Sequence, residues 1–200
     1  AARAWQNNVA HEDVRRMPHL MDILEKDGHA VKLLTQNKDE HIQFLEDLME
    51  RELEKGEKNR EELEPILQKL VQDMPDDRFY LEGWIVVASW AADMFNSLPK
   101  DQRTTGIDAG HCYGPCKGVM MCFDIVTPNR NVEMVARAWF NGVENEKYWD
   151  LFLGFVVSTI PAINKDNVII FRDGKVEISK TVDRHMPCLL YTSPSPRDGR

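Results

Sequence analysis

The chain has 200 residues, of which 42% are hydrophobic and 29% are charged, and its formal net charge at pH 7 is −8. This composition is ordinary for a soluble globular protein and argues against a disordered chain, and no apolar run approaches the roughly 20 residues that a membrane-spanning helix needs. The acidic balance argues against nucleic-acid binding by the chain as a whole, because phosphate contacts need clustered Lys and Arg. The acidic residues are concentrated between positions 39 and 64, however, so the average describes no single face.

The first part of the chain is predicted to be a helical, acidic segment over residues 1–74. Apolar residues recur there at i, i+3, i+4, i+7 and i+8, which lines one face of a helix: Leu63, Ile66, Leu67, Leu70 and Val71. A weaker stripe of the same kind precedes it: Ile42, Leu45, Met49 and Leu53. Gly56 is expected to separate the two helices, and Pro75 to stop the second one.

The hydrophobic period changes after residue 75 and predicts a sheet. Residues 84–90 form a candidate buried strand, followed by a short helix over 92–98 and a turn over 99–102. Three further strands are predicted over 104–111, 118–126 and 132–140, with turns at Gly114-Pro115 and over 128–131. The first of these three strands carries Asp108 near its centre.

The last predicted elements are a helix, a strand and a helix. An amphipathic helix is expected over residues 146–159 with Asn145 as its cap. Residues 167–171 are apolar throughout, as in a central strand covered on both faces, and this strand leads to Asp173. A final helix covers 176–185. Three consecutive antiparallel strands, a helix and a further strand predict an α/β protein with a mixed sheet.

Four segments, in this order and spacing, resemble the catalytic domain of Mutator-like element transposases, which has an RNase H-like fold. The segments are Thr105-Gly106-Ile107-Asp108-Ala109-Gly110-His111, then Lys117-Gly118-Val119-Met120, then Glu144 with Trp149, Phe152 and Leu153, and Val168-Ile169-Ile170-Phe171-Arg172-Asp173-Gly174-Lys175. Met186-Pro187 falls where a short loop leads into the family's next strand. The resemblance covers residues 75–187 and implies a partial RNase H-like transposase domain there.

The resemblance implies a catalytic metal site. Phosphodiester cleavage and strand transfer proceed by in-line displacement, and two divalent cations can stabilise both the attacking and the leaving oxygen. Asp108 and Asp173 match the family's first two acids, so Asp108 would bridge both ions and Asp173 would hold one, with Mg²⁺ or Mn²⁺ as the cofactor. The family's third acid lies further downstream, so the fragment is expected to be inactive alone.

The same resemblance implies the partners and the location. A cut-and-paste transposase binds the DNA of transposon ends and target, can form a homo-oligomer, needs no membrane and acts in the nucleus. His111, Lys117 and Lys175 are the candidate DNA contacts, although His111 is three residues beyond Asp108 and alternation places it on the opposite face. His111, Cys112 and Cys116 suggest zinc only weakly, because the spacing is loose and a fourth ligand is missing.

Two departures from the family suggest a degenerate copy. The first acid is followed by Ala109-Gly110-His111 where the family has Gly-Thr or Gly-His, and Arg172 stands where the family has Ser or Thr. The arginine would place a bulky cation beside a metal ligand.

Each candidate acid also has an ordinary structural reading. Asp108 could be a polar residue that only forms hydrogen bonds at a strand end, but an acid in an apolar strand is costly unless it is paired or metal-bound. Asp173-Gly174 alone would be a common turn. Four tryptophans are interpreted as core rather than base-stacking residues because each lies on an apolar face: Trp84, Trp90, Trp139 and Trp149.

The end of the chain is excluded from fold reasoning. Residues 188–198 resemble the in-frame translation of a sequencing-library adapter, so 188–200 is interpreted as a tail that is not native, and the native protein is expected to continue beyond Pro187. A natural Ser/Pro-rich linker is the alternative. The chain also begins without Met, which suggests a missing start. Cys112, Cys116, Cys122 and Cys188 form no disulfide framework, which fits a reducing compartment.

Two other functions remain open. The first is a DNA-binding transcription regulator derived from a transposase, with the fold retained and the chemistry lost. The second is a helical protein-interaction module whose acidic helices pair with a partner. That second function predicts mainly helical content over residues 75–187.

Overall fold

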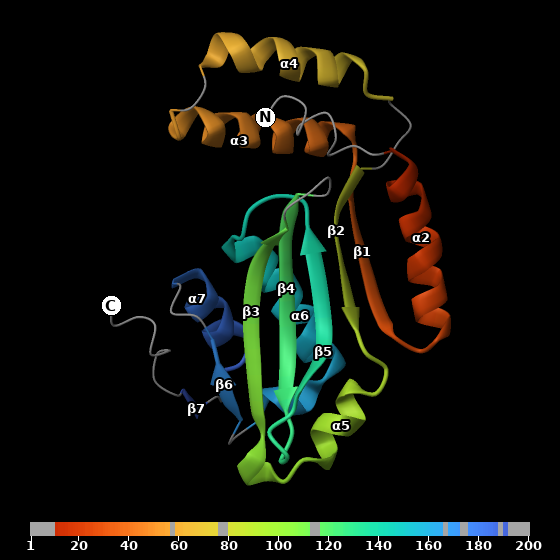
Figure 1. Cartoon of the computed structure of the whole chain (residues 1–200), viewed down its shortest axis with the longest axis vertical. Coiled ribbons are helices and arrows are strands. Elements are labelled where there is room, and N and C mark those ends of the chain that lie inside the picture. The colour runs from red at the N-terminus through yellow and green to blue at the C-terminus, as the bar shows by residue number, and fades with distance from the viewer. Residues whose placement is uncertain are drawn as a thin grey trace.

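The computed structural model of the chain describes residues 11–56, 59–75, 80–112, 117–165, 168–172, 176–187 and 190–191. These residues form an α/β protein with a mixed sheet of seven strands in the order β1-β2-β5-β4-β3-β6-β7 (Figure 1). The strands are β1 Ala30–Gln36, β2 Tyr80–Val87, β3 Thr104–Cys112, β4 Gly118–Val126, β5 Val132–Phe140, β6 Ile169–Phe171 and β7 Leu190–Tyr191. The helices are α2 His11–Lys26, α3 Lys38–Glu54, α4 Arg60–Gln72, α5 Ala91–Ser97, α6 Glu146–Thr159 and α7 Val176–His185, with short 3-10 helices at Lys100–Gln102 and Pro161–Asn164.

The predicted arrangement of the central strands is confirmed. Strands β3, β4 and β5 pair antiparallel in succession, and β6 pairs parallel with β3 after the chain has passed through α6. The bounds of β4, β5, α6 and α7 agree with the predicted ranges. Asn145 caps α6 as expected, since its side-chain oxygen accepts a hydrogen bond from the amide of Tyr148 at 2.9 Å.

The prediction that residues 1–74 are helical throughout is wrong for residues 30–36. These residues form β1, which pairs antiparallel with β2 and is the outermost strand at one edge of the sheet. The helices α3 and α4 are present as predicted, and Gly56 adopts a left-handed φ of 71° between them. The first part of the chain therefore contributes both a helical hairpin and a strand of the main sheet.

The main core lies between one face of the sheet and the helices α6 and α7, which Figure 1 shows on the same side of the strands. Alternate residues of the strands enter this core, among them Ile107 of β3 and Phe123 of β4, with exposed fractions of 3% and 0%. Trp149 of α6 is fully buried there, as predicted. Strand alternation places the intervening residues of β3, β4 and β5 on the opposite face, called the open face below.

Three of the four tryptophans that the sequence assigns to the core are less buried than predicted. Trp84 and Trp139 pair across β2 and β5 and are only partly buried. Trp90, in the turn before α5, is 42% exposed, so its assignment to the core is wrong. The turn places it outside the alternation of a strand.

The helical hairpin α3–α4 has a small core of its own. Leu45 and Met49 of α3 pack against Leu63 and Leu67 of α4. A stacked contact joins the hairpin to the sheet, with the rings of His41 and Tyr80 4.3 Å apart and nearly parallel. The hairpin projects beyond one end of the sheet (Figure 1).

The described part of residues 75–187 contains both strands and helices in similar amounts, with β2, β3, β4 and β5 each eight or nine residues long. The mainly helical content that a helical interaction module predicts for this region is not what the structure shows.

None of the helices within the described ranges is long and apolar enough to cross a membrane. Leu190–Tyr191, from the tail excluded on sequence grounds, pairs parallel with β6, a backbone contact that depends little on side-chain type.

Candidate functional site

Asp108 lies in the middle of β3 on the open face of the sheet. Its neighbours Ile107 and Ala109 face the main core, so alternation directs Asp108 away from α6 and α7. The side chain is exposed, and one carboxylate oxygen accepts a hydrogen bond from the amide of Ala109 at 2.8 Å. The acid is therefore accessible from solvent in the middle of an interior strand of the sheet.

The parallel strand β6 ends close to Asp108. Its three residues pair with Thr104, Thr105 and Gly106, so Phe171 is level with Gly106, two residues before Asp108. The predicted site residues Asp173 and Lys175 follow β6 in the sequence but lie outside the described residues, as do Cys116 and Cys188.

Arg172 is held by the helix on the covered side of the sheet. Its guanidinium donates a hydrogen bond to the Ser179 hydroxyl of α7 at 2.5 Å. Strand alternation agrees, since Ile170 is buried in the main core whereas Phe171 is 54% exposed. The metal ligand expected beside Arg172 is Asp173, which lies outside the described residues, so the expectation that the arginine places its cation next to a ligand stays a prediction.

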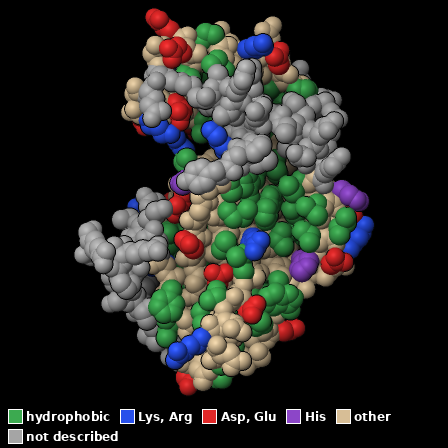
Figure 2. Space-filling model, viewed as in Figure 1, with side chains coloured by type: hydrophobic (Ala, Val, Ile, Leu, Met, Phe, Trp, Pro, Cys, Tyr) green, Lys and Arg blue, Asp and Glu red, His purple; other side chains and the backbone are tan. Residues whose placement is uncertain are grey.

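Two further charged residues lie on the open face beside Asp108. Asp124 of β4 pairs with Gly106, and Arg137 of β5 pairs with Cys122, the residue opposite Asp108. Asp108 and Asp124 are thus diagonal neighbours on adjacent strands, a separation of roughly 7–8 Å between backbone positions. Figure 2 shows this face, where hydrophobic side chains gather over the sheet with acidic and basic ones among them.

The environment of Asp124 disfavours its charged form. Burial raises the pKa of its carboxyl group and the negative charge of Asp108 raises it further, whereas the nearby Arg137 acts in the opposite direction. One carboxylate oxygen, Oδ1, is buried and has no hydrogen-bond partner among the described residues. An unsatisfied buried oxygen of this kind costs free energy, which a bound proton or cation would recover.

Cys122 lies between these charged residues and is not a candidate ligand or nucleophile. Burial raises the pKa of its thiol, and the charge of Asp124 raises it further. Because the thiolate is the reactive form, the raised pKa keeps this sulfur protonated and unreactive at neutral pH.

The carboxylate groups of Asp108 and Asp124 are the type of ligand that a hard divalent cation prefers. Mg²⁺ and Mn²⁺ bind carboxylate oxygens, and a cation near Asp108 and Asp124 would relieve both their mutual repulsion and the unsatisfied Oδ1 atom. Among the residues that the structure describes, no group of three or more His, Cys, Asp or Glu side chains could hold a metal ion.

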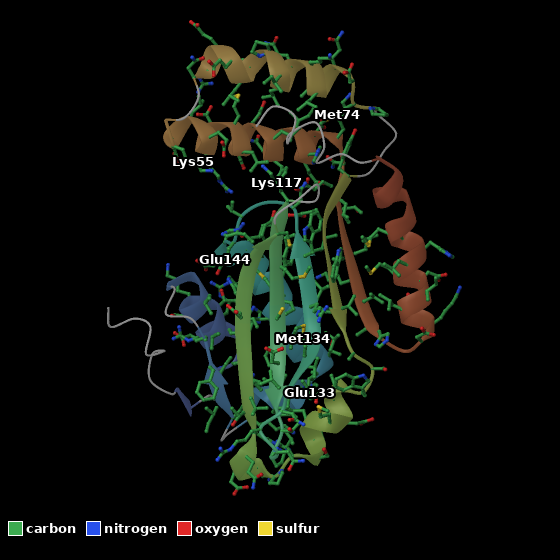
Figure 3. The ribbon with its side chains drawn as sticks, in the orientation of Figure 1. Lys55, Met74, Lys117, Glu133, Met134 and Glu144 are labelled. Atoms are coloured by element: carbon green, nitrogen blue, oxygen red, sulfur yellow. The ribbon has the colours of Figure 1, made fainter. Side chains whose placement is uncertain are left out.

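The secondary candidates lie away from Asp108. His111 pairs with Val119, a fully buried residue of the covered face, which agrees with the predicted alternation. Lys117 directly precedes β4 and lies at the end of the sheet nearest α3 (Figure 3). It is five residues from Cys122, the partner of Asp108, or about 17 Å along the strand. The structure therefore brings neither residue to Asp108.

Glu144, which matches an acid of the family pattern, has a structural contact. Its carboxylate accepts a hydrogen bond from Nε1 of Trp149 at 3.0 Å. This contact anchors the buried indole near the start of α6, which covers the face of the sheet opposite to Asp108.

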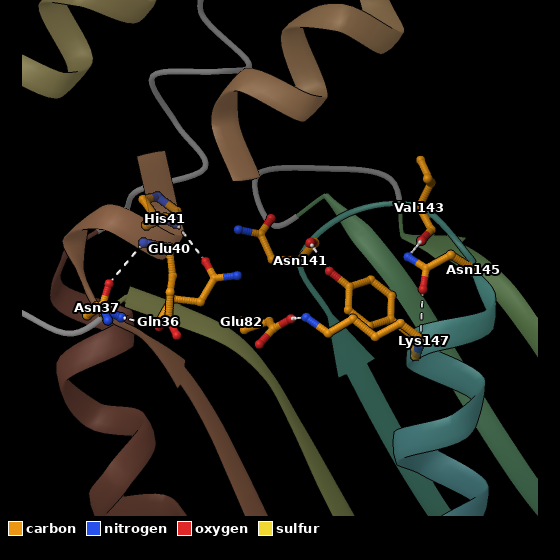
Figure 4. A network of polar contacts seen from close by, with 10 residues as sticks. Gln36, Asn37, Glu40, His41, Glu82, Asn141, Val143, Asn145 and Lys147 are labelled. Carbon is orange, nitrogen blue, oxygen red and sulfur yellow. Dashed lines mark hydrogen bonds and ion pairs between the residues drawn. The ribbon is translucent and has the colours of Figure 1, made fainter. Parts of the chain in front are cut away.

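A separate cleft of about 380 Å³ lies between α3 and the start of α6. None of the candidate site residues described above lines this cleft. Its lining is mixed: Thr35, Gln36, Glu40, Gln43, Phe44, Asp47, Leu48, Arg51, Glu82, Asn145, Lys147 and Tyr148. Figure 4 shows the polar network around it, in which Lys147 forms an ion pair with the buried Glu82.

This network links the hairpin, the sheet and α6. The hydroxyl of Tyr148 donates to the carbonyl of Asn141 at 3.0 Å, and burial raises the pKa of this hydroxyl well above its usual range. On the other side, Asn37 and Glu40 form a reciprocal capping box at the start of α3. The cleft walls are thus held by contacts that position α3 beside the sheet.

Sequence reasoning missed Asp124 and Arg137. For Asp124 the signal was available, because it is a charged residue in an otherwise apolar strand. Arg137 shares its strand with Glu133, so the signal there is weaker. They were passed over because neither lies in a segment that resembles the transposase family.

No protein-family model, no curated protein and no solved structure matches this chain.

Proposed function

We propose that this chain is part of a metal-dependent DNA transposase of the Mutator-like type, with Asp108 and Asp173 as ligands of Mg²⁺ or Mn²⁺. The observation that carries the proposal is the position of Asp108. It is an exposed acid on the open face of β3, on the strand next to β6, and β6 ends level with Gly106 just before the segment that contains Asp173.

The order of the strands supports an RNase H-like domain. Strands β3, β4 and β5 form the antiparallel series, and β6 returns to the other side of β3 in the parallel direction through α6. The resemblance in the sequence assigns the first acid to the first strand of this series and the second acid to the end of the parallel strand. Adjacent strands would then carry the two acids.

The residues of this chain would hold the cation and keep its surroundings open to DNA. When bound, such a cation neutralises the charge that develops on the phosphate oxygens. Asp108 offers carboxylate oxygens from an interior strand of the sheet, and the carboxyl group of Asp124 lies diagonally across from it on β4. Arg172 donates a hydrogen bond to Ser179 of α7, on the covered side of the sheet.

Metal binding by this chain tests the proposal directly. Terbium luminescence sensitised by tryptophan, with Mg²⁺ or Mn²⁺ as competitor, reports a carboxylate site without requiring activity. We expect Asp108→Asn and Asp173→Asn each to weaken binding at least tenfold, because each removes one anionic ligand. Asp93→Asn on α5 changes an exposed acid outside the site and is the matched control. Equal binding by all four proteins would contradict the site.

Activity requires a longer protein that supplies a third acid. In that protein, Mn²⁺-dependent nicking of supercoiled plasmid is expected to disappear in Asp108→Asn and Asp173→Asn and to persist in Asp93→Asn. A wild-type protein that binds DNA but never nicks it would instead favour a regulator derived from a transposase. Ala109 and Arg172, which depart from the family pattern, are the observations that favour this second function.

A further inference from the structure

The open face carries one cation in line with the proposed metal site. Arg137 of β5, Cys122 of β4 and Asp108 of β3 are paired residues in one row across three strands. Neighbouring strands lie about 4.8 Å apart, so the backbone of Arg137 is about 10 Å from that of Asp108. Both side chains are exposed on the same face.

We propose that Arg137 binds a backbone phosphate of DNA and so sets the path of the strand across β3, β4 and β5. This inference rests on the proposed function, since it takes the reacting phosphate to lie at Asp108. A DNA strand carries one phosphate for about every 3.4 Å of helix axis. A strand that crosses from β3 to β5 over about 10 Å therefore presents a further phosphate near Arg137.

The guanidinium of Arg137 is available for such a contact. Its Nε contacts the sulfur of Met134, and its two terminal nitrogens have no hydrogen bond or ion pair with any residue that the structure describes. Terminal guanidinium nitrogens form a planar fork that matches two phosphate oxygens. Met134, 39% exposed on the same strand, lies beside the inner end of the Arg137 side chain.

A purely structural role explains Arg137 less well. Its charge acts on Asp124 and Cys122, yet it forms no ion pair of 4.0 Å or less with Asp124 in the described chain. Two other exposed arginines are paired, since Arg60 binds Glu50 and Arg184 binds Asp150. Arg51 of α3 and Arg130 of the turn before β5 have no ion pair with a described residue either, but neither lies in a strand of the sheet. Arg137 is thus an arginine on the open sheet face whose charge the described residues do not pair.

The test is DNA binding without divalent metal. Fluorescence anisotropy of a short labelled DNA duplex, measured in EDTA over a series of salt concentrations, gives the dissociation constant and its salt dependence. We expect Arg137→Gln to weaken binding about tenfold and to reduce the slope of log K against log salt by about 0.9, the value for one phosphate contact. Arg137→Lys should retain the slope and lose part of the affinity, because lysine keeps the charge but not the fork.

Arg60→Gln is the matched control, because Arg60 is an exposed arginine of the helical hairpin. If wild-type protein binds DNA and Arg137→Gln keeps its affinity and slope, the role of Arg137 is overturned while the proposed function stands. An equal loss in Arg60→Gln would also overturn it. If the wild-type chain binds no DNA, this inference and the DNA-binding part of the proposed function fall together. Unfolding midpoints of all variants show whether any loss of binding reflects loss of folding.

Discussion

His41 shows how a single buried side chain joins the helical hairpin to the sheet. The imidazole is 3% exposed, stacks on Tyr80 and lies 3.0 Å from the side-chain oxygen of Gln36. Its Nε2 atom has no hydrogen-bond partner in the described part of the chain. Burial disfavours the imidazolium ion and lowers the pKa of His41 to about 4.

This pKa predicts that the protein loses stability in mild acid. The folded-state pKa of about 4 is below the ordinary value of 6.5, so folding favours the neutral ring. The stability associated with the neutral His41 ring is fully present above pH 6.5 and is lost progressively as the pH falls toward 4. At pH 5 we expect the free energy of unfolding to be lower than at pH 7 by about 2 kcal/mol from this group.

Urea unfolding at pH 7, 6 and 5 measures this loss. His41→Phe keeps an aromatic ring against Tyr80 without a titrating group, so its stability should change less over the same pH range. Parallel curves for the wild type and the variant would show that another group causes the acid sensitivity.

At the level of the elements, Gly83 permits β2 and β5 to pair closely. A Cβ atom at this position would lie 2.6 Å from Cδ1 of Phe140 and 2.6 Å from the carbonyl oxygen of Trp139. Backbone atoms of a paired strand cannot move aside without loss of hydrogen bonds. Glycine is therefore required by the contact between the strands.

We expect Gly83→Ala to lower the free energy of unfolding by about 1–3 kcal/mol, the usual effect of overpacking. Gly110→Ala is the matched control in β3, because a Cβ there meets no atom within 4 Å. Chemical denaturation of both variants tests the difference. A Gly83→Ala protein as stable as the wild type would show that β2 and β5 pair less closely than described.

Most elements could be predicted because their local signals agree with their contacts. The helix α6 has both a cap at Asn145 and an apolar stripe, and β4 alternates regularly between the two faces. The strand β1 was missed because Leu33 and Leu34 favour helices and only pairing with the distant β2 makes this segment a strand. Likewise β2 begins four residues before its predicted start, because Glu82 and Gly83 weaken the local signal.

The sequence singles out one residue of the candidate site but not its neighbours on the adjacent strands. Asp108 could be singled out because it interrupts an apolar strand within a segment that resembles the transposase family. The structure shows it exposed, so the cost of burying a charge does not apply to it. The association of Asp108 with Asp124 and Arg137 depends on the register of three strands, and a single sequence does not contain that register.

At the scale of the molecule, the hairpin and the sheet have separate cores. Leu63, 2% exposed, belongs to the small core between α3 and α4, whereas Trp149 and Phe123 belong to the main core. Contacts such as the stack of His41 on Tyr80 join the two parts. Separate cores predict that the hairpin can unfold locally while the sheet stays intact.

Leu63→Ala should therefore affect the hairpin most. The lost packing is expected to cost about 2–5 kcal/mol. Hydrogen exchange followed by mass spectrometry should show faster exchange in α3 and α4, with β3, β4 and β5 unchanged. Faster exchange throughout the sheet would mean that the two cores unfold as one unit.

The pairing of β1 with β2 determines where this protein can be divided. A fragment that starts at residue 75, the boundary the sequence suggests, would lack β1 and leave the amides and carbonyls along one side of β2 without partners. Unpaired strand edges recruit strands from other chains, so such a fragment is prone to aggregation. A shorter protein that retains Ala30–Gln36 keeps this edge covered.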